Sequence, residues 1–141
     1  MSTPVNDVAT PRTANADQPY LDALSEGNLI LPVCRHCGCW HWPAPFRCAK
    51  CGSWDIGWAP ASLEGSIFSW TRTHHPFSGC EAFDTPFVSV VVSLDQPPGI
   101  RLLGTLSGPE EELGIGKKVM GYPSQIEAFG KTVPCLKWSL A

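Results

Sequence analysis

Apolar and polar residues alternate through the second half of the chain, and this period of two predicts β-strands. The predicted strands cover 65–73, 86–94, 100–106, 117–122 and 133–140. In the first strand, Phe68 and Trp70 share one face and Ile67 lies on the other. In the second, every other residue from 88 to 94 is apolar, which predicts one buried face.

Turn-forming residues separate these strands, and no long helical period interrupts them. The run 96–99 (Gln-Pro-Pro-Gly) predicts a tight turn, and 114–116 (Gly-Ile-Gly) leads into the fourth strand. Glycine and proline contribute 13 and 14 of the 141 residues, which favours many short strands over a helical bundle. Five strands with these turns predict a mainly β chain that closes into a small barrel of the OB-fold type.

A short amphipathic helix is predicted over 18–26, ahead of the strands. Asp17 is a candidate N-cap, Pro19 fits the first turn, and Gly27 stands where a terminating glycine is expected. The apolar stripe of this helix consists of Tyr20, Leu21 and Leu24. Two interpretations stay open at this point: the stripe packs on its own domain, or it docks on a partner.

Three segments are expected along the chain: a disordered leader (1–17), a helix with a cysteine-rich segment (18–58) and the barrel (59–141). The leader is rich in Ser, Thr, Pro, Asn and Asp and lacks the apolar core of an export signal. No apolar run approaches the ~20 residues of a transmembrane helix. A cytoplasmic location is therefore predicted.

The composition excludes some classes of function. Hydrophobic residues make up 43% of the chain and charged residues 16%, so a disordered charged tail is excluded. The formal net charge of −3, with 10 Lys and Arg that form no cluster, argues against binding through nucleic-acid phosphates.

Two Cys-x-x-Cys-Gly motifs give the strongest chemical signal. Cys34 and Cys37 form one pair and Cys48 and Cys51 form the other, with ten residues between the pairs. This spacing allows four thiolates to surround one ion tetrahedrally, which predicts a zinc ribbon, with iron as the second choice of metal. Four protein ligands leave no open position, so the metal is expected to be structural. Cys39, His36 and His41 are interpreted as bystanders.

The remaining sequence is poor in catalytic motifs. Cys80 with His74 and His75 contains the residue types of a nucleophile and base, but an ordinary loop thiol is the simpler interpretation. Cys135 falls in a predicted strand and is expected to be a small buried apolar residue. No catalytic residue is assigned. A redox role for the cysteines is also considered, although thiolates bound to zinc exchange poorly.

Aromatic and basic residues gather on the loop between the two cysteine pairs. A ribbon of this size cannot bury three large aromatic side chains, so an interface is expected there. Basic side chains nearby are candidates for contacts with phosphates. The candidate contact residues are Trp40, Trp42, Phe46, Arg47, Lys50, Arg72 and His74.

Taken in order, these motifs resemble a family of small zinc-ribbon/OB-fold proteins associated with acyl-CoA enzymes, formerly a domain of unknown function. The resemblance runs from residue 18 to the C-terminus through the helix, a rubredoxin-like ribbon and the barrel strands, including 65–71 (Gly-Ser-Ile-Phe-Ser-Trp-Thr) and 99–104 (Gly-Ile-Arg-Leu-Leu-Gly). One departure concerns the aromatic-Pro-Pro-Arg run that the family carries before its third cysteine. Here Trp42-Pro43 is followed by Ala44, and Arg47 comes two positions late.

The resemblance implies a non-catalytic accessory subunit that acts with a partner enzyme. Such proteins scaffold thiolase-fold enzymes, of the β-ketothiolase or aldolase type, and help to bind CoA thioesters as a shared ligand; a heterotetramer is the expected assembly. A MaoC-like hydratase is the second choice of partner. The alternative from a different class is an OB-fold protein that binds single-stranded nucleic acid.

Overall fold

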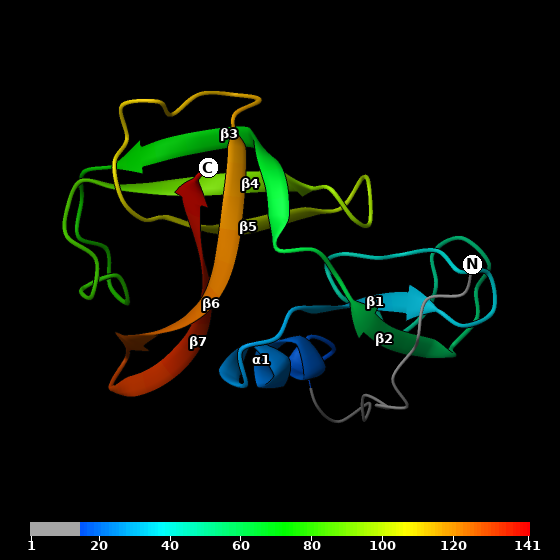
Figure 1. The fold of residues 1–141 in the computed structure, drawn as a ribbon. Coiled ribbons are helices and arrows are strands. Elements are labelled where there is room, and N and C mark those ends of the chain that lie inside the picture. Colours follow the sequence, from blue (N-terminus) through cyan, green and yellow to red (C-terminus); the bar gives the residue numbers. More distant parts are fainter. Residues whose placement is uncertain (1–14) are drawn as a thin grey trace.

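The computed structural model describes residues 15–141, so the first fourteen residues of the predicted leader lie outside the described part. One helix and seven strands follow one another along the chain (Figure 1). They are α1 (Gln18–Ser25), β1 (Ile30–Cys34), β2 (Ile56–Pro60), β3 (Glu64–Thr73), β4 (Phe87–Leu94), β5 (Arg101–Leu106), β6 (Lys118–Ala128) and β7 (Lys131–Leu140). Within the described residues, no helix is long and apolar enough to cross a membrane.

Helix α1 packs its apolar stripe against its own domain, which decides between the two interpretations of that stripe. Tyr20, Ala23 and Leu24 are buried, and Tyr20 and Leu24 belong to the main hydrophobic core. Asp17 occupies the N-cap position but its side chain makes no capping hydrogen bond, whereas Gly27 adopts the expected positive φ, of 86°. The outward face of α1 is polar.

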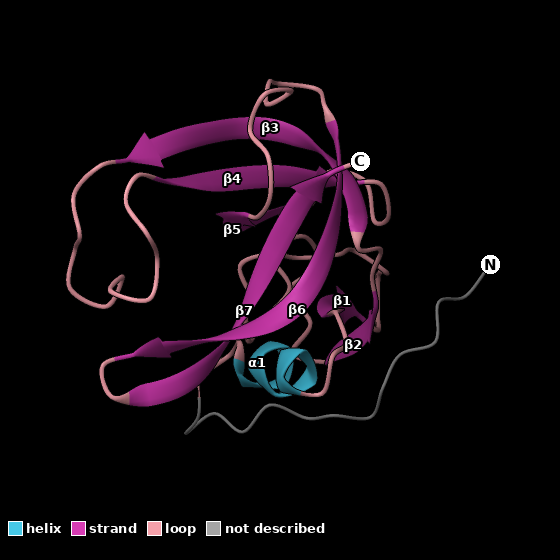
Figure 2. Cartoon of the chain, turned by 60° about the vertical axis from the view of Figure 1, so that its left-hand side comes forward, coloured by secondary structure: helices cyan, strands magenta, loops and turns pink. Residues whose placement is uncertain are grey.

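The ribbon is built on an antiparallel hairpin of β1 and β2, in register from Ile30↔Pro60 to Cys34↔Ile56. Trp58 on β2 is buried and joins the core that the ribbon shares with the barrel. In Figures 1 and 2, this hairpin lies beside the barrel, next to α1. The helix and the ribbon are thus tied to the barrel through shared apolar packing.

Strands β3 to β7 form a closed barrel in the order β3-β4-β5-β7-β6. All neighbours are antiparallel except β5 and β7, which pair in parallel at Thr105↔Lys137 and Leu106↔Trp138. Trp138 fills the barrel and has no exposed surface. Gly104 and Gly121 make room for it, because a Cβ on either glycine would approach the indole ring to 2.7 Å. The mainly β fold with one short helix, a ribbon and an OB-fold is confirmed.

The structure differs from the predicted strand pattern in two places. A β-bulge between Ile67 and Ser69 breaks the alternation in β3, so that Ile67 is buried, Phe68 is exposed and Trp70 turns back toward the core. An extra residue in one strand moves the following side chains to the other face. The second difference is length, because β6 and β7 continue past the predicted ends and pair as far as Ala128↔Lys131.

Candidate metal centre and partner surface

Each Cys-x-x-Cys-Gly motif folds into a tight turn that points two sulfurs the same way. In the first turn, the backbone N–H of Cys37 donates to Cys34 Sγ at 3.5 Å; in the second, that of Cys51 donates to Cys48 Sγ at 3.4 Å. The glycines that close the turns have φ values of 76° and 80°, a region that glycine enters without steric cost. The local sequence therefore positions all four sulfurs.

The two turns face each other, and the four Sγ atoms lie within 4.8 Å of one another. The Sγ atoms of Cys34 and Cys51 are 3.6 Å apart, as are those of Cys37 and Cys48. Tetrahedral zinc with Zn–S bonds of about 2.3 Å requires sulfurs about 3.8 Å apart, so the arrangement fits such an ion. A site with four protein sulfurs keeps no position for substrate or water.

The surroundings of Cys48 favour its thiolate form. The pKa of Cys48 is lowered to about 5, first because the backbone N–H of Cys51 donates to its sulfur. His41 contributes as well, with Nε2 at 3.2 Å from Cys48 Sγ. His41 was predicted to be a bystander, but in the structure it is in direct contact with this cysteine. The signal available in the sequence was only its position between the two pairs.

The other cysteines lie outside the four-sulfur cluster. None of the seven cysteines forms a disulfide in the structure of residues 15–141. The Sγ of Cys39 donates to the carbonyl of Trp40. No hydrogen bond connects the sulfur of Cys80 to His74 or His75 in the described part of the chain, and His75 contacts the ring of Phe77 instead. Burial raises the pKa of Cys135, which disfavours its thiolate. Among residues 15–141, no base is in hydrogen-bond contact with the sulfur of Cys39, Cys80 or Cys135, as a nucleophile would need.

The predicted aromatic patch is partly used inside the molecule. Trp40 and Trp42 are half-buried and pack against the core, and the ring of Trp42 lies 4.5 Å from that of Tyr20 on α1. The exposed aromatic residue of the ribbon is Trp54, at 55%, which was not among the predicted contact residues. Arg47 lies over the Trp54 ring at 5.4 Å and donates from Nε to the carbonyl of Gly52 at 2.7 Å.

The seven candidate contact residues do not form one site. Arg72 and His74 belong to the end of β3 and the loop after it, on the side of the barrel away from the ribbon (Figure 1). Arg72 forms an ion pair with Glu110 at 3.0 Å and lies over the ring of Trp70. Phe46 is half-buried in the ribbon, where Arg47 and Lys50 are exposed. The candidate residues that lie close together are therefore those on the ribbon.

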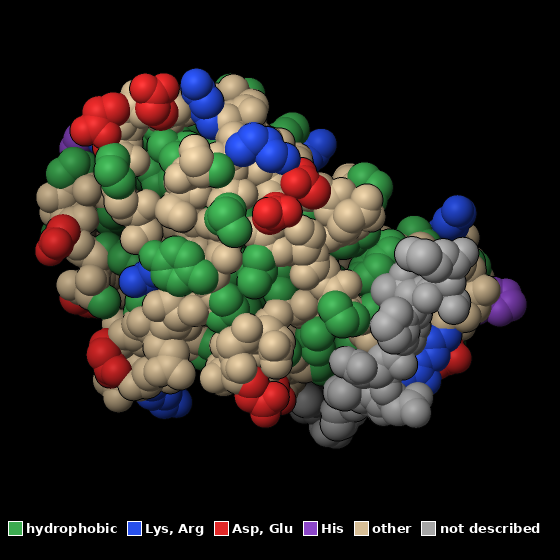
Figure 3. Space-filling model, in the orientation of Figure 1, with side chains coloured by type: hydrophobic (Ala, Val, Ile, Leu, Met, Phe, Trp, Pro, Cys, Tyr) green, Lys and Arg blue, Asp and Glu red, His purple; other side chains and the backbone are tan. Residues whose placement is uncertain are grey.

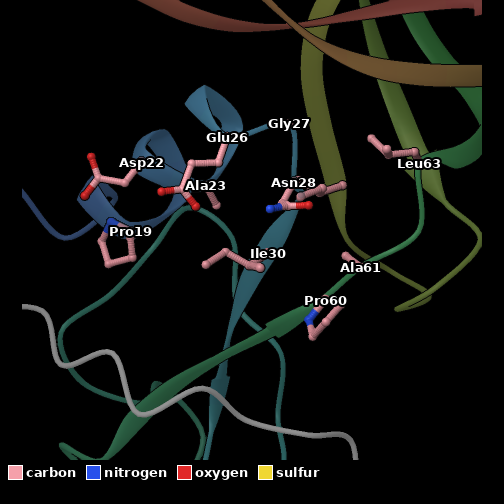
Figure 4. Close-up of a pocket in the computed structure, with 11 residues that line it drawn as sticks. Pro19, Asp22, Ala23, Glu26, Gly27, Asn28, Ile30, Pro60, Ala61 and Leu63 are labelled. Carbon is pink, nitrogen blue, oxygen red and sulfur yellow. The ribbon is translucent and has the colours of Figure 1, made fainter.

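A cavity of about 640 Å³ lies where α1, β1 and the segment between β2 and β3 meet (Figure 4). Its walls include Pro19, Ile30 and Leu63, and its rim carries the carboxylates of Asp22 and Glu26. None of the predicted contact residues lines it. Two carboxylates at the rim disfavour an anionic ligand such as a CoA phosphate.

On the face that Figure 3 draws, the described residues form no concentrated basic patch of the kind that nucleic-acid binding requires. On the face drawn in Figure 3, basic and acidic side chains are interspersed among apolar and neutral ones. Several basic residues are engaged in ion pairs, such as Lys118 with Asp95 at 2.9 Å. This distribution agrees with the negative net charge.

Two family models match the chain. The model of the ChsH2 rubredoxin-like zinc ribbon domain matches residues 21–55, and that of the ChsH2 C-terminal OB-fold domain matches residues 58–120. The solved structure of the Ltp2-ChsH2(DUF35) aldolase contains a similar chain, with 26% identity, a TM-score of 0.74 and coverage of 93% of this chain and 98% of that one.

Two further relatives are more distant or longer. A DUF35-family protein of unknown function from Sulfolobus solfataricus shares the fold, at 16% identity and a TM-score of 0.56 over 89% of this chain and 85% of that one. A probable enoyl-CoA hydratase alpha subunit from Thermomonospora curvata is 31% identical over 113 residues, which is 78% of this chain and 34% of the relative. The chain thus spans about a third of that protein's length. With both of its domains matched in order and its four ribbon cysteines clustered, the chain belongs to the ChsH2-type family of zinc-ribbon/OB-fold proteins, which is associated with acyl-CoA enzymes.

Proposed function

We propose that this protein is a non-catalytic accessory subunit of an acyl-CoA-processing complex, in which it binds and supports a thiolase-fold enzyme that makes or breaks C–C bonds. The observation that carries the proposal is the similarity, over nearly the whole of both chains, to a chain of the Ltp2-ChsH2(DUF35) aldolase. The partner supplies the catalytic residues. A heterotetramer of two subunits of each kind is the assembly we expect.

In this proposal Cys34, Cys37, Cys48 and Cys51 hold one structural zinc ion. When bound, the ion cross-links the two turns and supplies no Lewis acid, because its four positions are filled by protein sulfurs. The role of this chain's residues is to keep the ribbon stiff beside the barrel. The lack of disulfides among the cysteines of the described residues suits a reducing compartment, and the cytoplasm remains the predicted location.

Contact with the CoA moiety, if the complex shares its ligand, is assigned to the ribbon. Arg47, Lys50 and the exposed ring of Trp54 lie on one small module and combine cationic and aromatic surface. These groups suit the phosphates and the adenine of a CoA thioester. Arg72 is a weaker candidate, because Glu110 already neutralises it.

A hydratase of the MaoC type is the second candidate for the partner. The similarity to the Thermomonospora curvata protein, a probable enoyl-CoA hydratase alpha subunit, favours it. This chain corresponds to a third of that relative, so the hydratase function belongs to a larger protein and is carried to this chain only as a proposal.

The experiment that tests the proposal is co-purification from the native host, followed by mass spectrometry of stoichiometric companions. We expect a thiolase-fold enzyme whose turnover of acyl-CoA falls when the accessory chain is removed and returns when it is added back. Recovery of a hydratase would favour the second candidate. Recovery of single-stranded nucleic acid, or turnover of acyl-CoA by the isolated chain, would contradict the proposal.

A further inference from the structure

Strands β6 and β7 form a long hairpin that extends beyond the barrel (Figures 1 and 2). The two strands stay in antiparallel register from Val119↔Leu140 to Ala128↔Lys131, without a break. Only two residues, Phe129 and Gly130, connect them. The distal part of the hairpin therefore presents a tight turn at the end of a regular two-stranded ribbon.

Phe129 is an unusual residue for this turn. Both connecting residues have positive φ, 52° for Phe129 and 74° for Gly130, as a two-residue turn of type I′ requires. Asn, Asp or Gly normally occupy the first position, because a bulky side chain is strained in the left-handed region. Within the described part of the chain, Phe129 is the one non-glycine residue with positive φ. The fold of the hairpin alone would favour Asn here.

Burial in the monomer does not explain the phenylalanine. The Phe129 side chain is 76% exposed, so it gains little from removal of apolar surface from water. Strained backbone that persists without a benefit to the fold points to a role in function. An exposed aromatic ring alone would carry no such conclusion, but here the exposure and the backbone conformation coincide at one residue.

The ring of Phe129 is supported from one side by the loop between β3 and β4. A Cβ placed on Gly79 of that loop would lie 2.6 Å from the Phe129 ring, so the glycine backbone approaches the ring closely. Gly79 itself has a φ of 89°. Two segments far apart in the sequence thus meet at this ring, and contact on one side restricts its movement before any partner arrives, which lowers the entropic cost of binding.

The surroundings of Phe129 are acidic. The Gly79 N–H donates to the Glu81 carboxylate at 2.9 Å, and Asp84 lies in the same loop. Residues 74–86 contain no Lys or Arg. Glu127 on the hairpin accepts a hydrogen bond from Thr132 Oγ1, and Lys131 follows the turn, so that three carboxylates stand against one ammonium group. An anionic membrane surface would repel this end of the molecule, whereas a protein pocket edged by basic side chains would complement it.

We propose that Phe129 is an anchor that inserts into an apolar pocket, edged by Lys or Arg side chains, on the partner enzyme. This inference rests on the proposed function and adds the element through which the partner is held. The turn maintains a strained conformation so that the hairpin presents an aromatic ring instead of a small polar side chain. Aromatic residues that insert into desolvated pockets carry a large share of the affinity at protein interfaces.

The test uses the full chain and the enzyme recovered by co-purification. Phe129→Asn fits the turn better than the native residue, so its melting temperature should equal or exceed that of the wild type. Its dissociation constant for the enzyme, measured by titration calorimetry, should rise at least tenfold. Phe68→Thr is the matched control, since it removes another exposed aromatic side chain from the barrel but keeps a residue suited to a strand. The control should bind as the wild type does.

Each outcome separates the anchor from the proposed function. Wild-type affinity in Phe129→Asn would overturn the anchor and leave the accessory function standing. A clear fall in its melting temperature would show that Phe129 serves the fold, which would also overturn the anchor. If the wild-type chain does not bind the enzyme, the proposed function fails first and the anchor fails with it. If the chain alone forms a dimer in sedimentation and Phe129→Asn abolishes that dimer, the anchor serves a second copy and the proposal is wrong.

Discussion

His41 Nε2 and Cys48 Sγ lie 3.2 Å apart, at the edge of the four-cysteine cluster. His41 is on the loop between the two cysteine pairs, and its backbone N–H donates to the carbonyl of Pro32 on β1 at 3.0 Å. A ring N–H directed at a thiolate withdraws charge from the sulfur and holds the ligand in place. The loop between the pairs therefore supports the metal centre as well as connecting its halves.

Replacement of His41 by Phe is expected to weaken zinc retention by roughly tenfold, because such outer partners typically change metal affinity by 10–100-fold. The measurement is the rate of zinc transfer to a colorimetric chelator. His36→Phe is the control, because His36 is exposed and acts on a sulfur, that of Cys34, through its backbone, which the substitution keeps. Equal transfer rates for the two variants would contradict the role of His41.

Loss of one sulfur should empty the metal site, since zinc binding and folding of such a ribbon are coupled. Cys48→Ser is expected to purify without stoichiometric zinc and with a ribbon open to proteolysis between β1 and β2. Cys39→Ser should keep its zinc, because Cys39 lies outside the cluster. Metal content by plasma mass spectrometry checks both variants. Zinc lost equally from both would show that the ligand set has been misassigned.

The sequence predicted most of what depends on short-range pattern. The spacing of the cysteines and the glycine after each pair define the two turns locally, and alternation locates all five barrel strands. The bulge at Ile67 and Ser69 was not predictable, because it depends on the register with β4. The burial of Trp42 was missed for a similar reason: its partner, Tyr20, is twenty-two residues away in the sequence and reaches it only through the packing of α1.

The barrel interior leaves no room for a side chain at Gly104. A Cβ there would lie 2.5 Å from the Leu136 carbonyl oxygen and 2.7 Å from the Trp138 ring. Gly104→Ala is therefore expected to lower the free energy of unfolding by about 1–3 kcal/mol, as overpacked cores do. Gly114→Ala, where the nearest atom is a Lys117 side-chain carbon at 3.8 Å, should be neutral or slightly stabilising. Urea denaturation compares the two variants, and a stable Gly104→Ala would refute the packing described for Trp138.

Tyr20 links the stability of α1 to alkaline pH. The pKa of its phenol is raised from 10.0 to about 12, mainly by burial. The electrostatic effects of Cys135 and Asp17 add to the rise. Because the folded pKa exceeds the unfolded one, the stabilising contribution is complete below pH 10 and is lost as pH rises from 10 to 12. A shift of this size corresponds to at most about 3 kcal/mol.

Tyr20→Phe keeps the ring against Trp42 but has no proton to lose, so it should match the wild type at pH 7 and exceed it in stability above pH 10. The check is the free energy of unfolding of both proteins from pH 7 to 11.5, and curves that stay parallel throughout would show that Tyr20 ionises freely in the folded state.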